Sequence, residues 1–238
     1  MVEHKETKIK NKYFSNTKSI KYEELTKGID AVIFDMDGTL ADSMHIWKDI
    51  DIEFLKNRGI EMPEDLQASI RGISLYQIAI YFINRFGFKD TPEELIKEWN
   101  DMAFDMYSTK IELKPGALKL IKRLKEDNIK MAIASSNSGY LLEGFVKHYD
   151  LDRYFSYYCT GDKFKKGKPA PDCYLHTAEM INIPPSKCLV FEDITEGIQS
   201  AKSAGMLVCG VSDDYSKNDI EEKYLLSDFY VDSLEELF

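Results

Sequence analysis

Short apolar segments, each ending in polar residues, alternate along the chain with segments of helical periodicity. Such near-continuous apolar stretches are typical of strands in a parallel sheet that helices cover on both faces. Five of them are present: Ala31–Phe34, Met131–Ala134, Tyr157–Cys159, Leu189–Phe191 and Leu207–Cys209. Between them apolar residues recur at helical spacing, as from Leu141 to Tyr149. The alternation predicts an α/β fold with a doubly wound, Rossmann-like parallel sheet.

One interval departs from this alternation. Between the first predicted strand and Leu113 the pattern is helical throughout, and Thr91–Glu94 has the sequence of a capping box with proline at the first helical position. A long helical insertion after a first strand is most simply a second, smaller domain. We therefore expect a helical cap domain at 43–110 and a core domain formed by 29–42 and 111–238.

Residues 1–28 form a basic N-terminal extension, with seven Lys against four Glu. We interpret this segment as a solvated extension or a short additional element. It contains no apolar stretch of the kind that a secretory signal requires. The apolar runs of the chain all fall short of the ~20 residues needed to span a bilayer, so we expect no membrane partner.

The chain as a whole is acidic, with 31 Lys and Arg against 41 Asp and Glu and a formal net charge of −10 over 238 residues. This charge disfavours nucleic acid as a partner, because proteins that bind it use basic residues to neutralise phosphates. The four cysteines have no CxxC or metal-ligand spacing. Free thiols are typical of a reducing compartment, so we expect a cytoplasmic protein, either a monomer or a weak homo-oligomer.

Polar residues follow three of the predicted strands, where ligands bind in open α/β sheets. These residues are Asp35 and Asp37 after the first strand, Ser135, Ser136 and Asn137 after the second, and Glu192 and Asp193 after the fourth. Each group alone is an ordinary turn or helix cap. Together they would place four carboxylates in one crevice, where mutual repulsion favours a raised pKa or a bound cation. Carboxylate oxygens suit Mg²⁺, which commonly shares its ligands with a substrate phosphate.

The order of these residues resembles the haloacid dehalogenase-like hydrolase superfamily. The first motif of that family, DxDGT, is matched by Asp35–Thr39, and its second, a Ser or Thr, by Ser135. The third, a lysine, is matched by Lys168 in the stretch GKPAPD, and the fourth by the pair Glu192–Asp193. The similarity extends over residues 29–238. The helical insertion corresponds to the small cap of the β-phosphoglucomutase-like branch.

This resemblance implies a role for each acidic residue. Asp35 would be the nucleophile that forms an aspartyl-phosphate. Asp37 would protonate the leaving oxygen and then deprotonate the attacking water. Mg²⁺ would be held by Asp35, the backbone carbonyl of Asp37, and Asp193 with help from Glu192.

The resemblance also implies a phosphate-binding group. Lys168 and the Ser135 hydroxyl would hold phosphoryl oxygens, together with polar groups of Ser136 and Asn137 and nearby backbone N–H groups. Thr39 would support the loop rather than contact the substrate.

Two cap residues are expected to set specificity. Arg71 resembles a position in the cap loop that faces the site, where it would bind distal hydroxyls or a second phosphate of the substrate. The alternative for Arg71 is an exposed side chain at a helix end. Trp47 would form a wall of the leaving-group pocket. β-Phosphoglucomutases resemble this chain but have a His at the position of Trp47 and a cap Arg at the position of Leu75.

The leading hypothesis is a Mg²⁺-dependent phosphatase that hydrolyses a small phosphorylated metabolite, such as a sugar phosphate. A β-phosphoglucomutase-like phosphosugar mutase is the alternative among enzymes, with the departures at Trp47 and Leu75 against it. A dehalogenase fits less well, because that branch lacks the second Asp that Asp37 supplies. A non-catalytic regulatory or binding protein with the same fold is the alternative of another class, although every motif residue is present.

Overall fold

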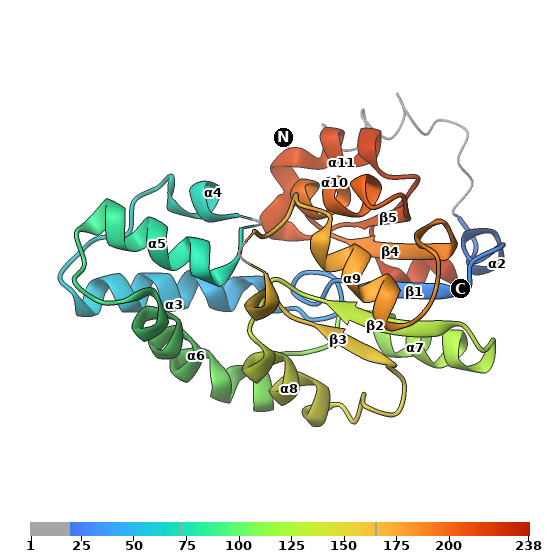
Figure 1. Ribbon diagram of the computed structural model, residues 1–238, viewed down its shortest axis with the longest axis horizontal. Coiled ribbons are helices and arrows are strands. Elements are labelled where there is room, and N and C mark those ends of the chain that lie inside the picture. The colour runs from blue at the N-terminus through green and yellow to red at the C-terminus, as the bar shows by residue number, and fades with distance from the viewer. Residues whose placement is uncertain (1–19, 72, 165) are drawn as a thin grey trace.

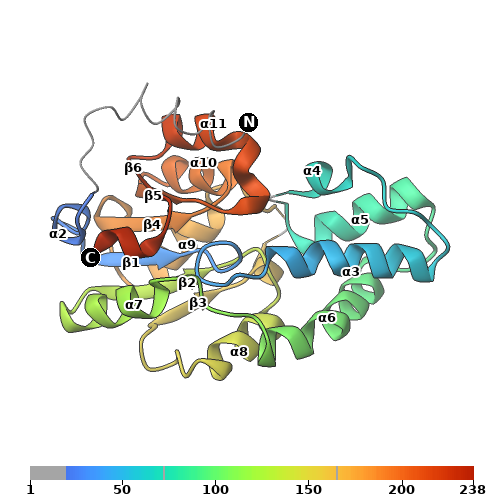
Figure 2. The same ribbon diagram turned by 180° about the vertical axis from the view of Figure 1, so that it is seen from behind.

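The computed structural model describes residues 20–71, 73–164 and 166–238. Figures 1 and 2 show a sheet with helices on both faces and, beyond one end of its strands, a group of four helices, α3 to α6. In the sequence this helical group lies between the first strand and the rest of the sheet. Most of the predicted N-terminal extension, residues 1–19, lies outside the described residues.

The sheet has six parallel strands in the order β3-β2-β1-β4-β5-β6. The strands are β1 (Ala31–Phe34), β2 (Lys130–Ala134), β3 (Tyr157–Cys159), β4 (Cys188–Glu192), β5 (Leu207–Val211) and β6 (Phe229–Val231). This arrangement confirms the predicted doubly wound α/β fold. The short edge strand β6 was not among the predicted strands. The strand order reverses between β1 and β4, and ligands bind at such a switch point in open sheets.

Alternate residues along the strands pack into two separate cores, as strand geometry requires. In β1, Val32 and Phe34 join the core that includes α7 and α8, whereas Ala31 and Ile33 join the core that includes α9 and α10. The helices of this domain are α2 (Tyr22–Leu25), α7 (Ala117–Glu126), α8 (Gly139–His148), α9 (Asp172–Met180), α10 (Thr195–Ser203) and α11 (Ile220–Leu226). Short 3₁₀ segments are η1 (Gly161–Lys163), η2 (Pro185–Lys187), η3 (Asp214–Asp219) and η4 (Leu234–Leu237).

The helical group, which we call the cap, packs its buried apolar side chains together, and they are continuous with the core that contains Val32 and Phe34. Its helices are α3 (Met44–Asn57), α4 (Leu66–Ile70), α5 (Leu75–Phe86) and α6 (Pro92–Thr109). The predicted capping box at Thr91–Glu94 starts α6, and a second one, from Ser74 to Gln77, starts α5. The ring of Phe54 on α3 packs 5.3 Å from that of Trp99 on α6, between centroids. These contacts make the cap a folded unit that the chain enters and leaves near the ends of the strands.

The described part of the N-terminal segment belongs to the core domain. Helix α2 buries Tyr22 and Leu25, and the Tyr22 ring stacks on Phe238 with centroids 6.2 Å apart. Among the described residues, none of the helices has the length and apolar character needed to cross a membrane.

Candidate active site

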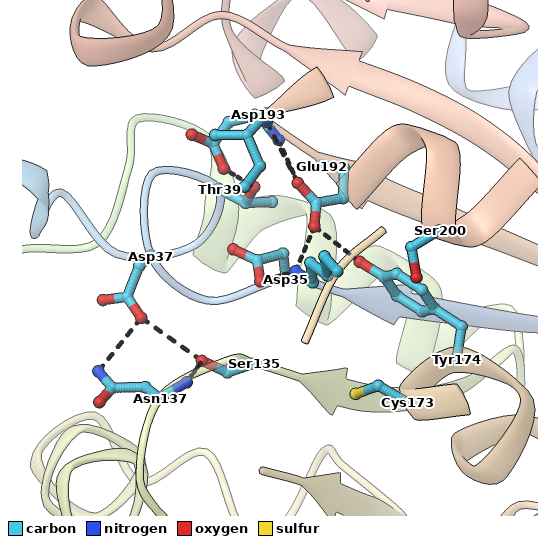
Figure 3. A network of polar contacts seen from close by, with 12 residues as sticks. Asp35, Asp37, Thr39, Ser135, Asn137, Cys173, Tyr174, Glu192, Asp193 and Ser200 are labelled. Atoms are coloured by element: carbon cyan, nitrogen blue, oxygen red, sulfur yellow. Dashed lines mark hydrogen bonds and ion pairs between the residues drawn. The ribbon is translucent and has the colours of Figure 1, made fainter. Parts of the chain in front are cut away.

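Three acidic side chains gather where β1 and β4 end, at the switch point of the sheet. Asp35 follows β1, Glu192 is the last residue of β4, and Asp193 follows it. All three are buried, and each offers a carboxylate oxygen within 4.8 Å of those of the other two. The sheet topology therefore brings together three of the four acidic residues that the sequence pattern singled out (Figure 3).

Lys168 lies between two of these carboxylates. Its Nζ donates to Oδ1 of Asp35 at 2.6 Å and also to Oε1 of Glu192. Burial lowers the pKa of Lys168, but the Asp35 and Glu192 carboxylates raise it more, which leaves that pKa well above its ordinary value. The ammonium group thus stays charged in a buried position because it is paired on two sides.

Both carboxylate oxygens of Glu192 are bound by donors from the protein. Besides Lys168, Oε1 accepts a hydrogen bond from the Tyr174 hydroxyl at 2.8 Å, and Oε2 accepts from the backbone N–H groups of Asp193 and Ile194. At Gly197, a Cβ atom would lie 1.9 Å from Oε1, so the start of α10 can approach Glu192 only with glycine there. This arrangement fits Glu192 for holding Lys168 and the Asp193 loop in place.

Asp193 has a different environment. Thr39 donates to its Oδ1 at 3.2 Å, but Oδ2 is buried and has no hydrogen-bond partner among the described residues. The Gly38 backbone, with a φ of 80°, lies so close that a Cβ there would be 2.4 Å from this oxygen. Burial and then the charges of Glu192 and Asp35 raise the pKa of Asp193 well above its ordinary value. An unpartnered buried carboxylate oxygen beside Asp35 is the feature expected of a divalent-cation ligand.

Asp35 itself has features expected of a nucleophile. Burial raises its pKa, Lys168 opposes this shift, and the neighbouring carboxylates of Glu192 and Asp37 add to it. A cation bound at this end of the sheet would favour the charged form that attack requires.

Asp37 is held by hydroxyl and amide groups instead of by a cation. Oδ1 accepts from the Ser43 hydroxyl at 2.6 Å and from the Tyr107 hydroxyl. Oδ2 accepts from Asn137 Nδ2 at 3.3 Å and from Ser135 Oγ at 3.4 Å, as Figure 3 shows. These donors hold the Asp37 carboxyl group beside the carboxyl ends of β1 and β2.

The second group of polar residues also lies where it was predicted. Ser135 follows β2, and its hydroxyl accepts a hydrogen bond from the backbone N–H of Asn137 at 3.0 Å. Ser136 and Asn137 line the same cavity as Asp35, Asp37 and Lys168. Figure 3 shows Ser135 and Asn137 on the opposite side of Asp37 from Glu192 and Asp193.

The cavity between the core and the cap has a volume of about 390 Å³. A site of this size suits a small metabolite. Its core side carries Asp35, Asp37, Lys168 and Asp193, and its cap side includes mostly apolar residues of α3, α4 and α5. A phosphate at the core side would therefore direct the rest of its molecule into the cap.

Arg71 and Trp47 both line this cavity, and the structure adds partners that the sequence did not predict. The Arg71 guanidinium forms ion pairs with Glu196, at 3.2 Å, and with Asp219. Arg71 is therefore a half-buried side chain paired with core carboxylates at the cavity wall, and its expected role as a ligand of substrate hydroxyls or of a second phosphate stays a prediction. Trp47 forms part of the wall, as expected, and its Nε1 also donates to the Tyr107 hydroxyl at 2.7 Å.

Sequence reasoning did not find Ser43, Tyr107 or Tyr174, whose hydroxyl groups donate to carboxylates of the candidate site. A signal exists for two of them. Ser43 and Trp47 are four residues apart on one face of α3, and Tyr107 continues the buried face of α6 that contains Trp99 and Ala103. Such spacing predicts which face is buried, but it gives no information about the partner.

Comparisons with known proteins agree with this geometry. The family model for haloacid dehalogenase-like hydrolases matches residues 32–211. The phosphorylated carbohydrates phosphatase of Thermotoga maritima is 32% identical over 178 residues, covering 75% of this chain and 82% of that protein. (DL)-glycerol-3-phosphatase 2 of Arabidopsis thaliana is 34% identical over 217 residues, covering 84% and 87%.

A solved structure supports the fold in addition. The β-phosphoglucomutase of Clostridium difficile superposes with a TM-score of 0.75 at 24% identity, covering 88% of this chain and 93% of that one. The family match begins in β1, includes the cap and ends in β5. This chain is therefore a member of the haloacid dehalogenase-like hydrolase family, in its β-phosphoglucomutase-like branch.

Proposed function

We propose that this protein is a Mg²⁺-dependent phosphatase that hydrolyses a small phosphomonoester, such as a sugar or polyol phosphate, through an aspartyl-phosphate on Asp35. The observation that carries the proposal is the pairing of Asp35 with Lys168 at 2.6 Å in the same cavity as Asp37. One small site thereby contains a nucleophile, a cation that can bind the phosphoryl oxygens, and an acid–base group. Relatives named as phosphatases of phosphorylated carbohydrates and of glycerol 3-phosphate support the substrate class.

In the first half-reaction, a carboxylate oxygen of Asp35 attacks phosphorus while the bond to the ester oxygen breaks. The leaving alcohol takes its proton from Asp37. This transfer needs Asp37 to be protonated when the substrate binds, and the hydroxyl donors Ser43 and Tyr107 hold its carboxyl group in position. The products of this step are the free alcohol and a phosphorylated Asp35.

In the second half-reaction, a water molecule attacks the phosphorus atom of the aspartyl-phosphate. Asp37, now ionised, accepts a proton from this water, and the bond between phosphorus and the Asp35 oxygen breaks. Inorganic phosphate leaves, and both aspartates return to their starting state. One acid–base group serves both steps because the leaving alcohol and the water approach from the same side.

Positive charge and hydrogen-bond donors stabilise the transferred phosphoryl group. Lys168 is held between Glu192 and Asp35, and Ser136 and Asn137 line the same cavity. The Ser135 hydroxyl lies within hydrogen-bond distance of Asp37. Donors fixed before the reaction stabilise developing charge without the cost of reorientation.

Asp35, the backbone carbonyl of Asp37 and Asp193 would hold Mg²⁺, and the unpartnered Oδ2 of Asp193 fits this role. When bound, the ion supplies positive charge that draws the Asp35 carboxylate and the phosphoryl group together. Glu192 contributes by holding the Asp193 N–H and Lys168, since both of its oxygens are occupied.

A phosphosugar mutase is the second candidate, because β-phosphoglucomutases are among the relatives. Trp47 argues against it: its indole N–H donates to Tyr107, and an indole has no basic nitrogen that could relay a proton. We also favour catalysis over a purely regulatory role, because each motif side chain lies within the site.

The test is release of inorganic phosphate from a panel of sugar and polyol phosphates and from phenyl phosphate, with Mg²⁺ and with chelator. We expect Mg²⁺-dependent hydrolysis in the wild type and none in Asp35→Asn. Isomerisation of a hexose phosphate without phosphate release would favour the mutase. Inertness toward the whole panel, with and without metal, would favour a non-catalytic role.

A further inference from the structure

The cap wall of the cavity has a polar end that the proposed chemistry does not use. Asp51 on α3 is 6% exposed, and its Oδ2 accepts a hydrogen bond from Gln67 Nε2 of α4 at 2.6 Å. Trp99 on α6 is 2% exposed, and its Nε1 is buried without a hydrogen-bond partner in the part of the chain that the structure describes. Asp51, Gln67 and Trp99 all line the cavity that contains Asp35.

These groups lie among mostly apolar neighbours on the cap side, where Glu64 and Arg71 are the other polar residues of the described lining. Ile70, Ile73, Leu75 and Ile78 line the same wall. A buried N–H without an acceptor is costly, and so is a buried carboxylate with a single neutral donor. Burial raises the pKa of Asp51 to about 7, although the Gln67 amide opposes this shift. A ligand that accepts from Trp99 and donates to Asp51 would relieve both costs.

We propose that Asp51, Gln67 and Trp99 form a subsite for the distal hydroxyl groups of a polyhydroxy phosphomonoester. Hydroxyl groups fit because each one both donates and accepts a hydrogen bond. Asp51 and Gln67 can bind them at their polar atoms, and the Trp99 N–H supplies a second donor. This inference rests on the proposed phosphatase function and names the part of the substrate that the cap recognises.

The helix geometry sets the length of the substrate. Ser43, Trp47 and Asp51 follow one another at intervals of four residues, so they lie along one face of α3. Ser43 contacts the acid–base group Asp37, and Asp51 is eight residues further on, which corresponds to about 12 Å along the helix axis. Such a span suits an extended chain of five or six carbons between the phosphate and the last hydroxyl, and it exceeds the reach of a three-carbon ester.

The charge of the subsite sets a second preference. A carboxylate at this end repels a second phosphate, and Arg71, the residue expected to bind one, is paired with Glu196 and Asp219. The subsite therefore favours monophosphates with a neutral polyol end over bisphosphates.

The test compares kcat/KM of the Mg²⁺-loaded protein on a hexitol 6-phosphate, glycerol 3-phosphate, a hexitol bisphosphate and phenyl phosphate. We expect the wild type to prefer the hexitol monophosphate over both glycerol 3-phosphate and the bisphosphate. In Asp51→Leu, the ratio of kcat/KM for hexitol phosphate to that for phenyl phosphate should fall about tenfold or more. Trp99→Phe, which keeps a ring in the cap core, should lower the same ratio several-fold.

Glu53→Gln is the matched control, because Glu53 is an exposed carboxylate on α3 outside the cavity; it should leave the ratio unchanged. The inference is overturned if the wild type has no preference for the longer chain, or if the ratio is unchanged in both Asp51→Leu and Trp99→Phe. A wild type that releases phosphate from none of the esters, phenyl phosphate included, would overturn the proposed function and this inference with it. Thermal melting shows whether each variant is folded. If Asp51→Leu or Trp99→Phe does not fold, the kcat/KM ratio of the other variant tests the inference.

Discussion

The hydroxyl of Tyr107, at the end of cap helix α6, donates a hydrogen bond to Oδ1 of Asp37, which lies 70 residues earlier in the core domain. Trp47 in turn donates to the same tyrosine oxygen. Burial and the charge of Asp37 raise the pKa of Tyr107 well above its ordinary value, so the phenol keeps its proton and remains a donor. The position of Asp37, the proposed acid–base group, thus depends on a cap residue.

Tyr107→Phe should therefore lower kcat about tenfold on alkyl phosphates, because one of the donors that orient Asp37 is lost. The loss should be smaller on p-nitrophenyl phosphate, whose good leaving group needs less help from a general acid. Steady-state kinetics on both esters measure the difference. Tyr140→Phe is the control, since Tyr140 is an exposed ring stacked on Phe104. Equal losses on the two esters would point to a folding or closure defect instead.

Asp35→Asn should abolish turnover while the protein stays folded. An amide cannot act as the nucleophile, whereas its shape matches that of the buried carboxyl group. Neutralising Asp35 removes the unfavourable desolvation of a buried carboxylate, but it also leaves Lys168 with Glu192 as its charged partner. Because these two effects oppose each other, we expect a small change in melting temperature. Phosphate release and a thermal melt, measured on the same sample, check both parts. Phosphatase activity close to wild type would exclude Asp35 as the nucleophile.

Asp193→Ala should weaken Mg²⁺ binding more than Glu192→Ala does. Oδ2 of Asp193 has no partner within residues 20–71, 73–164 and 166–238, but both oxygens of Glu192 are occupied by Lys168, Tyr174 and backbone N–H groups. Glu192→Ala should instead lower the melting temperature, because Lys168 loses one of its two buried partners. Calorimetric titration with Mg²⁺ and a thermal melt separate the two effects. Unchanged Mg²⁺ affinity in Asp193→Ala would contradict the assignment.

Arg71→Ala should raise KM two- to fivefold to a similar degree for large and small esters. Its ion pairs with Glu196 and Asp219 join the cap to the core, and pairs that are partly exposed contribute roughly 0–1 kcal/mol each. Kinetics at low and high salt check this reason, because salt screens the ion pairs and should raise the KM of the wild type toward that of the variant. A rise in KM for the larger esters alone would instead indicate that Arg71 binds the substrate.

Asp51 should make stability depend on pH in a direction opposite to that of an ordinary surface carboxylate. With its pKa raised to about 7 by burial, Asp51 keeps its proton in the folded state after the unfolded chain has lost it. The contribution of Asp51 to stability therefore falls as pH rises from about 4 to about 7, by at most roughly 1.4 kcal/mol per unit. Urea unfolding at several pH values gives the free energy of unfolding of wild type and of Asp51→Asn. Relative to wild type, the free energy of unfolding of the variant should rise across this window and stay level above it. A constant difference between the two would contradict the raised pKa.

The core of the site could be predicted from the sequence because its signals are local. Asp35 and Asp37 directly follow an apolar strand, and Glu192 and Asp193 end another. The geometry of parallel sheets brings the carboxyl ends of neighbouring strands to one edge, so the pattern of apolar runs is enough to place these carboxylates together. Lys168 was found through the resemblance to a family rather than through a local signal. The three-residue strand β6 was missed because an edge strand of that length has no distinctive pattern.

The sequence by itself therefore determined the α/β class, the helical insertion and the acidic chemistry at the ends of the strands, since periodicity and motif order record these directly. Only the tertiary structure decided which partners the cap residues bind. Whether Tyr107 meets Asp37, Arg71 meets Glu196 and Asp219, or Asp51 meets Gln67 depends on how separate helices approach one another. Helical spacing states which residues share a face, but the residue opposite that face is set by the packing of the whole domain.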